Sequence, residues 1–237
     1  MVNIKSKNPL RIGLVGGVSW TSTAEYYRRL HLTFAGSEHP GIVLVDLNFK
    51  QVLEAQELNL VDRELELVSD GISRTVNAGG EIILVCSNTT SRTLKSIGRN
   101  LACNIVNVID CVSEYINRNH FKECLLVGTR YTMERDFYRS ALLGQGRVIR
   151  TPEEEDRIII HDMIYNELCM GKLHNKSVKL FTDMLYSYTS TFPNLDSIIL
   201  GCTELSLLGI KKRLNQCVVI DTISTHIERA VQLASGT

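Results

Sequence analysis

Two cysteines of this 237-residue chain stand at matching places in two short apolar runs. Cys86 ends the run Ile83–Cys86, and Cys202 ends the run Ile199–Cys202, 116 residues further on. A thiol can give or take a proton, so two thiols on opposite sides of one carbon atom could remove its proton and replace it from the other face. The pair predicts acid/base chemistry in which both cysteines act together.

Polar residues follow each cysteine; they are Ser87, Asn88, Thr89, Thr203 and Glu204. We expect a helix to begin just beyond each cysteine, where unpaired N–H groups and the helix dipole would lower the pKa of the thiols. The same N–H groups, with the nearby hydroxyls and amide, would bind a carboxylate. Donors aimed at the charge that develops when an amino acid loses its α proton contribute strongly to catalysis.

The remaining cysteines and the histidines predict neither a metal site nor a disulfide framework. The seven cysteines are an odd number, and no two form a C-x-x-C pair. Free cysteine is usually a small buried hydrophobic residue, and we expect this of Cys103, Cys111, Cys124, Cys169 and Cys217. The six histidines, which include His31, His161 and His226, lack metal-ligand spacing, so we expect them on the surface or in the core.

Composition excludes several classes of partner. Twenty-six basic residues balance 26 acidic ones, and 44% of the chain is hydrophobic. Such a protein has no long-range field that draws it to nucleic acid or an anionic membrane. The longest apolar runs are far shorter than the roughly 20 residues that cross a bilayer, and residues 1–10 lack the apolar core of a secretion signal. We therefore expect a cytoplasmic protein with a small-molecule partner, no nucleic acid and no membrane.

Short β-branched runs alternate with longer amphipathic segments. The predicted strands are Arg11–Gly16, Ile42–Asp46, Ile82–Cys86, Ile105–Val108, Glu123–Gly128, Arg147–Arg150, Ile198–Gly201 and Val218–Asp221. Strands that alternate with helices indicate parallel pairing through right-handed crossovers, hence an α/β fold. Pro152 and the acidic residues after it predict the start of a helix that runs to about Met170 and stops at Gly171.

Three short strings recur in the same order, which predicts two similar halves. Leu14–Gly16 recurs as Leu126–Gly128, Val108–Asp110 as Val219–Asp221, and Ile83–Cys86 as Ile199–Cys202, at offsets of 112, 111 and 116 residues. We predict a first subdomain of residues 1–108 plus 221–237 with Cys86, and a second of residues 109–220 with Cys202. Open α/β sheets bind ligands at the carboxyl ends of their strands, so both cysteines would line the cleft between the subdomains.

The motifs around both cysteines resemble those of the aspartate/glutamate racemase family. Its members carry one cysteine in C-x-N-T and the other in G-C-T-E, which stand here as Cys86–Thr89 and Gly201–Glu204. The segment Ile12–Tyr27 is similar to the GGMSW-x-ST-x-x-YY start of the branch that includes broad-specificity amino-acid racemases, and Gly128–Glu134 is similar to that branch as well. The resemblance runs from about Arg11 to the final helix near Ala230.

The resemblance implies roles for particular residues. Cys86 and Cys202 would be the catalytic acid and base on opposite faces of the substrate Cα. The residues implied around the substrate are Val18, Gln56, Ser87, Asn88, Thr89, Thr129, Thr203 and Glu204. Gly16 and Gly17 would let the backbone come close to the substrate. The resemblance also implies a homodimer, and no cofactor signature is evident, so we expect the enzyme to need no cofactor.

The departures from the family pattern concern the substrate. Val18 replaces the usual Met, and Ser91 and Arg92 replace a His and a Lys that often follow the first motif. In the long central helix, only Arg157 offers a basic group for a side-chain carboxylate. With the neutral Gln56 near the presumed pocket, these residues predict broad specificity or a modest preference for aspartate and glutamate.

Other functions stay open at this point. The Gly13-x-x-Gly16-Gly17 segment lacks the G-x-G-x-x-G order of a dinucleotide-binding turn, which disfavours nucleotide binding. One alternative is a related isomerase or decarboxylase of small dicarboxylates that uses the same two thiols. Another is a catalytically silent amino-acid or dicarboxylate sensor. Proton exchange at the substrate Cα would distinguish an enzyme from a sensor.

Overall fold

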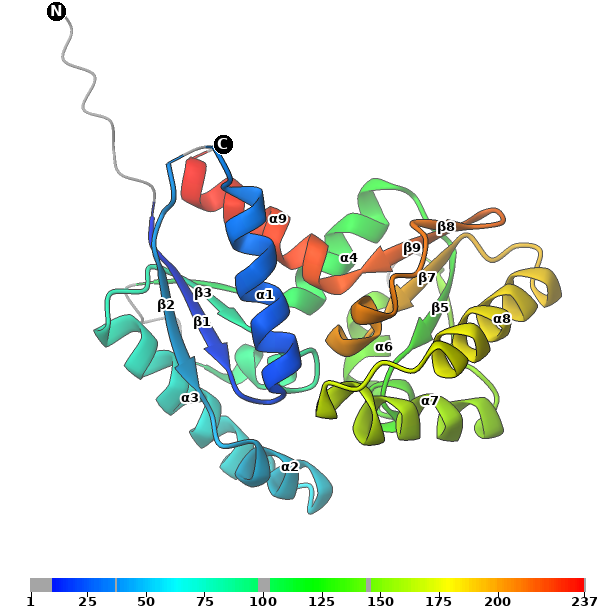
Figure 1. Ribbon diagram of the computed structural model, residues 1–237, viewed down its shortest axis with the longest axis horizontal. Helices are drawn as coiled ribbons and strands as arrows, with labels where there is room; N and C mark the ends of the chain where they lie inside the picture. Colours follow the sequence, from blue (N-terminus) through cyan, green and yellow to red (C-terminus); the bar gives the residue numbers. More distant parts are fainter. Residues whose placement is uncertain (1–9, 37, 98–102, 144–145, 237) are drawn as a thin grey trace, which may run out of the picture.

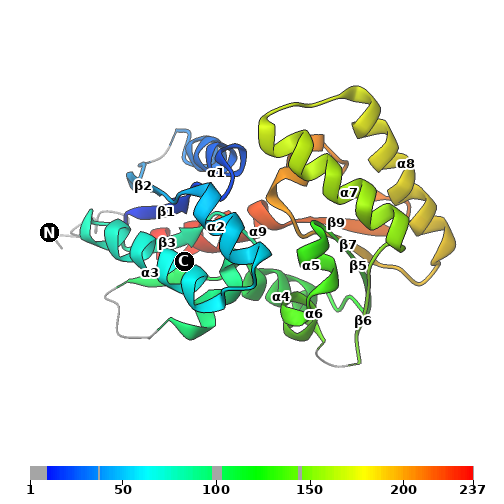
Figure 2. The ribbon, with the colours of Figure 1, turned by 90° about the horizontal axis from the view of Figure 1, so that it is seen from below.

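The computed structural model describes residues 10–36, 38–97, 103–143 and 146–236. These residues form two separate sheets, each flanked by helices (Figure 1). Seen from below, the two halves lie side by side, with α2 of the first half facing α5 and α7 of the second (Figure 2). The predicted α/β fold with two mostly parallel sheets is confirmed. No helix in the described ranges could span a membrane.

The first sheet has the order β2-β1-β3-β4, and all of its strands are parallel. They are β1 (Ile12–Gly16), β2 (Ile42–Asp46), β3 (Ile82–Val85) and β4 (Asn104–Val106). Every residue of β1 and β3 is buried, as expected for central strands that helices cover on both faces. Val15 pairs with both Val45 and Val85, so the three strands end level at one edge.

Helices cover both faces of this sheet because successive strand residues point to opposite sides. The helices of this half are α1 (Trp20–Thr33), α2 (Phe49–Glu57), α3 (Val61–Asn77), the 3-10 helix η1 (Thr90–Ser96) and the C-terminal α9 (Thr222–Ser235). Tyr26 of α1 and Ile223 of α9 pack with Leu14 on one face. Ile72 of α3 packs with Val15 on the other.

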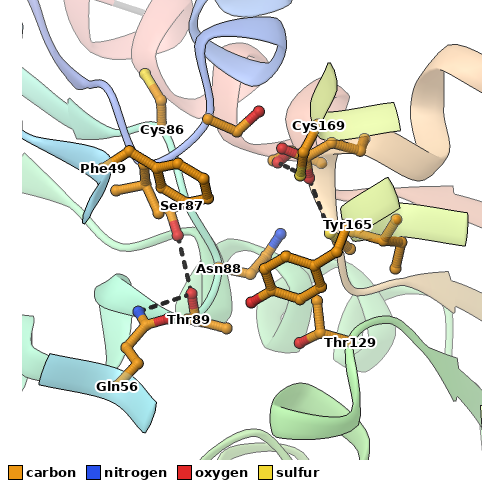
Figure 3. A pocket seen from close by; sticks show the side chains of 15 residues that line it. Phe49, Gln56, Cys86, Ser87, Asn88, Thr89, Thr129, Tyr165 and Cys169 are labelled. Atoms are coloured by element: carbon orange, nitrogen blue, oxygen red, sulfur yellow. Dashed lines mark hydrogen bonds between the residues drawn. The ribbon is translucent and has the colours of Figure 1, made fainter. Parts of the chain in front are cut away.

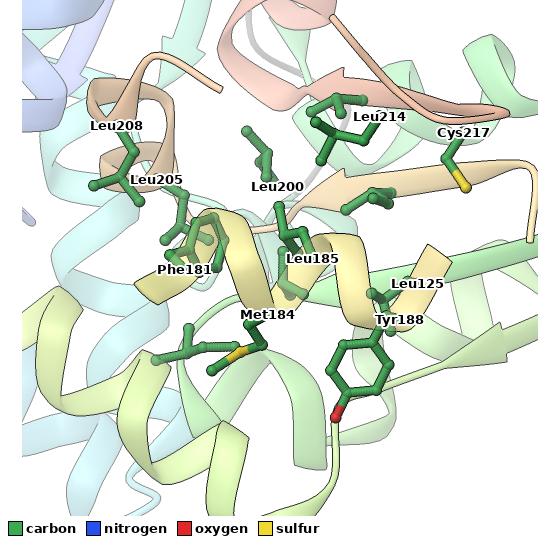
Figure 4. Close-up of a cluster of buried hydrophobic side chains, with 14 of the residues drawn as sticks. Leu125, Phe181, Met184, Leu185, Tyr188, Leu200, Leu205, Leu208, Leu214 and Cys217 are labelled. Atoms are coloured by element: carbon green, nitrogen blue, oxygen red, sulfur yellow. The ribbon is translucent and has the colours of Figure 1, made fainter. Parts of the chain in front are cut away.

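The second sheet has the order β6-β5-β7-β9-β8, with only β8 antiparallel among its described strands. Its strands are β5 (Glu123–Val127), β6 (Val148–Arg150), β7 (Ser197–Leu200), β8 (Arg213–Leu214) and β9 (Cys217–Asp221). The helices around it are α4 (Val108–Arg118), α5 (Arg130–Glu134), α6 (Asp136–Leu142), α7 (Glu154–Asn166), η2 (Leu168–Met170), α8 (Asn175–Thr191) and η3 (Thr203–Leu208). Phe181 and Leu185 of α8 pack with Leu200 on one face (Figure 4). Val112 of α4 packs with Leu126 on the other.

The two sheets share one strand order, β2-β1-β3-β4 against β6-β5-β7-β9. The strings Leu14–Gly16 and Leu126–Gly128 start in the matching strands β1 and β5. The strings that end in the two cysteines start in β3 and β7 and run past the ends of these strands. The third repeat is wrong: Val108–Asp110 lies in the first turn of α4, whereas Val219–Asp221 lies in β9. The subdomain boundaries at residues 108 and 220 stay a prediction.

Several element boundaries differ from the sequence prediction. The strand predicted over Ile105–Val108 ends at Val106, because the Asn107 side chain accepts a hydrogen bond from the Ile109 N–H and caps α4. The helix predicted to Met170 is α7 only to Asn166, followed by the 3-10 turn η2 and by Gly171 in the left-handed conformation. The two-residue strand β8 was not predicted, because so short a run carries no periodic signal.

His226 connects α9 to the rest of the first half. Its Nε2 lies 2.8 Å from the Val106 carbonyl oxygen and its Nδ1 lies 2.8 Å from the Tyr26 hydroxyl. Because a carbonyl can only accept, Nε2 carries the proton and the Tyr26 hydroxyl donates to Nδ1. The ring is fully buried, and burial lowers the pKa of His226 to about 4. The folded protein therefore requires a neutral imidazole.

We predict that acid destabilises the fold through His226. The unfolded imidazole has a pKa near 6.5, so its stabilisation is complete above that value and is lost as the pH falls toward 4. The free energy of unfolding should fall by about 1.4 kcal/mol per pH unit in this range. Urea unfolding at pH 7 and pH 5 measures the slope, with His226→Gln as the variant that lacks the titrating ring. Equal pH dependence in both proteins would rule this out.

Candidate active site

One pocket lies between the two halves, and 15 residues from both halves line it (Figure 3). Its cavity volume is about 40 Å³, which is enough for a few water molecules. Every residue that the sequence analysis placed at the site lines this pocket: Val18, Gln56, Cys86, Ser87, Asn88, Thr89, Thr129, Cys202, Thr203 and Glu204. The structure brings these residues together, while the individual role of each stays a prediction.

The parallel strands bring the two cysteines to the pocket. Cys86 follows β3, and its N–H donates to the Val15 carbonyl at 2.9 Å, which continues the pairing of β3 with β1. Its own carbonyl accepts from the Ser22 hydroxyl at 2.7 Å. Cys202 follows β7, where the Gly201 N–H donates to the Val127 carbonyl at 2.7 Å. Each thiol therefore stands at the carboxyl end of the corresponding strand in its own sheet.

The turn after β1 needs glycine for packing within the protein. Gly17 has a φ of +83°, and a Cβ there would lie 2.3 Å from the backbone oxygen of Leu47. A Cβ on Gly16 would collide with the Thr23 side chain at 2.4 Å. The two glycines were expected to allow close approach to the substrate. In the structure they let this turn pack against Leu47 and Thr23, and the next residue, Val18, reaches the pocket.

Hydrogen bonds from both halves hold the loop after Cys86. The Ser91 hydroxyl donates to the Ser87 carbonyl at 2.7 Å. The Asn88 amide nitrogen donates to the Thr222 hydroxyl at 3.1 Å, and its oxygen accepts from the Tyr138 hydroxyl at 3.2 Å. Because Tyr138 belongs to α6 and Thr222 opens α9, this loop is fixed relative to the second half as well as the first.

Glu204 lies beside Cys202. Its Oε2 accepts from the Cys202 thiol at 2.8 Å and from the Thr203 hydroxyl at 3.0 Å. The Glu204 side chain is almost completely buried. The carboxylate therefore holds the Cys202 thiol by a hydrogen bond.

Burial makes the two thiols weak acids. Desolvation raises the pKa of Cys86, with a smaller contribution from the Asp46 carboxylate. Desolvation also raises the pKa of Cys202, and the Glu204 carboxylate adds to this. The prediction of lowered pKa values is therefore wrong. Each cysteine is followed by a 3-10 helix of seven residues or fewer, so the helix dipole is too weak to offset desolvation of the thiolate.

A buried ion pair supports the wall of the pocket at Gln56. The Arg92 Nε and Nη2 donate to Glu64 Oε2 at 3.1 and 2.5 Å. The Gln56 Nε2 donates to Glu64 Oε1 at 2.7 Å and to the Thr89 hydroxyl at 3.3 Å. Arg92, one of the departures from the family pattern, therefore reaches the site only through Glu64 and Gln56. Ser91, which also departs from the family pattern, donates a hydrogen bond to Ser87 and so holds the loop after Cys86.

Five further residues line the pocket that the sequence analysis did not place there: Ser19, Phe49, Ile164, Tyr165 and Cys169. Cys169 was expected in the core, but it is only partly buried and faces the pocket beside Glu204. It gets there because η2 turns the chain back after α7. Only the GGMSW-like start could have indicated Ser19. Phe49, Ile164 and Tyr165 carry no sequence signal that separates them from core residues.

The described residues that line this pocket include no Lys, Arg or His. Arg157 donates to the Pro152 carbonyl at 2.8 Å and pairs with Glu134, away from the pocket lining. The ranges that the structure describes contain no cluster of three His, Cys, Asp or Glu residues that could hold a metal ion. The polar groups of the pocket lining are three thiols, hydroxyls, amides and one carboxylate.

We predict that both thiols alkylate only at high pH. Their raised pKa values mean that the thiolate fraction falls tenfold for each pH unit below the pKa, so reaction with iodoacetamide should still be rising at pH 10. Mass spectrometry of the two tryptic peptides measures the rate against pH, with glutathione as the exposed reference. Limited access of the reagent to a buried thiol lowers the rate by the same factor at every pH. The pH at which the rate curve inflects therefore depends on the thiol pKa and not on access. An inflection near pH 8.5, the value of a free thiol, would contradict the prediction.

Comparison with known proteins assigns the family. Residues 15–230 match the model of the Asp/Glu/hydantoin racemase family. A candidate Asp/Glu racemase from Yersinia pestis is 29% identical, with 95% of this chain and 99% of that chain covered and a TM-score of 0.79. An aspartate racemase homologue from Pyrococcus horikoshii OT3 is 28% identical, with the same coverage and a TM-score of 0.78.

A glutamate racemase from Campylobacter jejuni subsp. jejuni shares the fold, at 18% identity, 94% and 85% coverage and a TM-score of 0.65. The family model covers most of the chain, and this confirms the resemblance seen in the motifs. The chain belongs to the Asp/Glu/hydantoin racemase family and is an isomerase of the racemase type.

Proposed function

We propose that this protein is a cofactor-independent amino-acid racemase in which Cys86 and Cys202 form a two-base pair. One observation carries the proposal: two thiols, at the ends of corresponding strands in two similar sheets, line the same small pocket. A pair that approaches from two halves can reach both faces of one carbon atom. The names of the similar proteins, an aspartate racemase homologue and a glutamate racemase, support an amino acid as the substrate.

The proposed reaction moves two protons and needs no other reactant. One cysteine, as thiolate, takes the α proton from one face, and the other thiol donates a proton to the opposite face. The enzyme then holds the two cysteines in exchanged protonation states, ready for the opposite enantiomer. Positioning and hydrogen bonding to the substrate carboxylate stabilise the carbanion-like transition state. Donors for that carboxylate are available from the second amide hydrogen of Asn88 and the hydroxyl of Thr129.

The raised thiol pKa values fit a two-base mechanism. A raised pKa makes each thiolate a stronger base toward the α proton. The opposite thiol, although weakened as an acid by burial, is still far more acidic than the Cα–H of an amino acid, so it can protonate the carbanion. Glu204 accepts a hydrogen bond from the Cys202 thiol, which holds that thiol in place at the pocket. A cytoplasmic location, a homodimer and breadth across several amino acids stay part of the proposal.

Replacement of either cysteine should abolish racemisation. In Cys86→Ala or Cys202→Ala one face of the substrate has no acid or base, so kcat should fall by at least about a thousandfold. Chiral chromatography measures turnover, and NMR of L- and D-amino acids in deuterium oxide measures α-proton exchange. Cys103→Ser, outside the pocket lining, is the control. A single-alanine variant that still racemises at wild-type rate would refute the two-thiol mechanism, and binding without exchange would favour the sensor.

Activity should survive removal of metals and cofactors. Protons are transferred by side chains alone in the proposed reaction, so kcat after dialysis against a chelator should stay within about twofold of the starting value. The spectrum should lack the near-ultraviolet to visible band of a pyridoxal Schiff base. Loss of turnover that one added metal or pyridoxal phosphate restores would show that the proposal is incomplete.

A further inference from the structure

We propose that Glu64 and Arg92 orient the Gln56 amide so that the pocket selects amino acids with uncharged, hydrogen-bond-donating side chains and disfavours those with a second carboxylate. This inference rests on the proposed racemase function and names its substrate class. It follows from which atoms of Gln56 are already in use, and from the charges of the groups that line the pocket.

The direction of the Gln56 amide is determined by its neighbour Glu64. A carboxylate only accepts hydrogen bonds, so the atom 2.7 Å from Glu64 Oε1 must be the amide nitrogen. The second hydrogen of that nitrogen is directed to the Thr89 hydroxyl at 3.3 Å. Both donors of Gln56 are therefore engaged within the protein. Its carbonyl oxygen, an acceptor, remains for a ligand in the pocket that Gln56 lines.

Arg92 fixes Glu64 in turn. Glu64 has no exposed surface, and the Arg92 side chain is 15% exposed. Two guanidinium nitrogens of Arg92 bind the second carboxylate oxygen, and its guanidinium carbon lies 5.2 Å from the centroid of the Tyr131 ring. The Arg92 charge is therefore paired with Glu64 and is not available to a substrate. Glu64 and Arg92 act only through Gln56, so they are positioning residues.

The other lining groups add no positive charge. Among the described residues that line the pocket there is no Lys, Arg or His, and the only carboxylate is Glu204. Gln56 comes from the first half and Glu204 from the second, and Figure 3 shows Gln56 across the pocket from Cys169, the neighbour of Glu204. Glu204 suits the substrate ammonium, which leaves Gln56 for the far end of the substrate side chain.

The consequence for substrates follows from donor and acceptor matching. An amide or hydroxyl at the end of the side chain can donate to the Gln56 carbonyl, whereas a carboxylate would face another acceptor after losing its water. Asparagine and aspartate have nearly the same shape, as do glutamine and glutamate. Each pair therefore isolates the effect of the charge and the donor from the effect of size.

The test compares kcat/KM for asparagine with aspartate and for glutamine with glutamate. In the wild-type enzyme the amide should be favoured by at least about tenfold in each pair. In Glu64→Gln the new amide can donate to the Gln56 carbonyl, which lets the Gln56 amide turn its nitrogen toward the pocket. The ratio of kcat/KM for the amide substrate to kcat/KM for the acidic substrate should then fall at least about threefold. Gln56→Met removes the acceptor and should lower the ratio as well. Gln51→Met, at an exposed position of the same helix, should leave the ratio unchanged.

The ratio is measured on one sample with two substrates, so it does not depend on how much of a variant is folded. A wild-type preference for aspartate over asparagine, or for glutamate over glutamine, overturns the inference. This holds also if the cause is that the glutamate side chain extends to Arg130 or Arg135, which line the adjoining cavity. Ratios in Glu64→Gln and Gln56→Met that equal the Gln51→Met value also overturn it. Racemisation with the wrong preference defeats this inference alone, whereas absence of α-proton exchange for every amino acid defeats the proposed function.

Discussion

Desolvation of the two thiols is the constraint on which this site depends. A cysteine in water is ionised near pH 8.5, but burial holds Cys86 and Cys202 as thiols and raises the pKa of both. A carbon acid as weak as an amino acid requires a strong base, and a desolvated thiolate is stronger than a solvated one. In the proposed mechanism one of the two cysteines acts as that base, and Glu204 Oε2 lies 2.8 Å from the Cys202 sulfur.

A desolvated site requires rigid walls, and the fold supplies them from both halves. The loop after Cys86 is bonded to Thr222, the first residue of α9, and to Tyr138 in α6 of the second half. The C-terminal helix α9 returns to the first sheet and is held there by His226 between Tyr26 and Val106. The chain therefore crosses between the halves more than once, and the crossing into α9 is tied to the pocket residue Asn88 through Thr222.

The pocket wall at Gln56 shows how a distant charge can determine chemistry without touching the substrate. Arg92 could have been a ligand for an acidic side chain, but its guanidinium is paired with the buried Glu64. A buried pair of this kind adds little net stability, because desolvation of both charges offsets their attraction. Its effect is instead geometric, since it leaves the Gln56 amide only one orientation that satisfies both neighbours.

The sequence alone determined the α/β class, the family and ten of the 15 residues that line the pocket, because these depend on local patterns. Strand-ending cysteines with polar residues after them, and the repeated strings in β1, β3, β5 and β7, can be read without a structure. The prediction that Val108–Asp110 repeats as Val219–Asp221 was wrong. Apolar strings recur by chance, and the Asn107 cap starts a helix at Val108.

Only the tertiary structure decided the electrostatics and the remaining walls of the site. The thiol pKa values follow from burial, which depends on how two sheets far apart in sequence meet, so local helix-dipole reasoning gave the wrong sign. Cys169 reaches the pocket through the turn η2, and Arg92 is withdrawn from it by a glutamate 28 residues away. Desolvation and charge pairing are sums over neighbours in space, and the order of residues along the chain does not specify those neighbours.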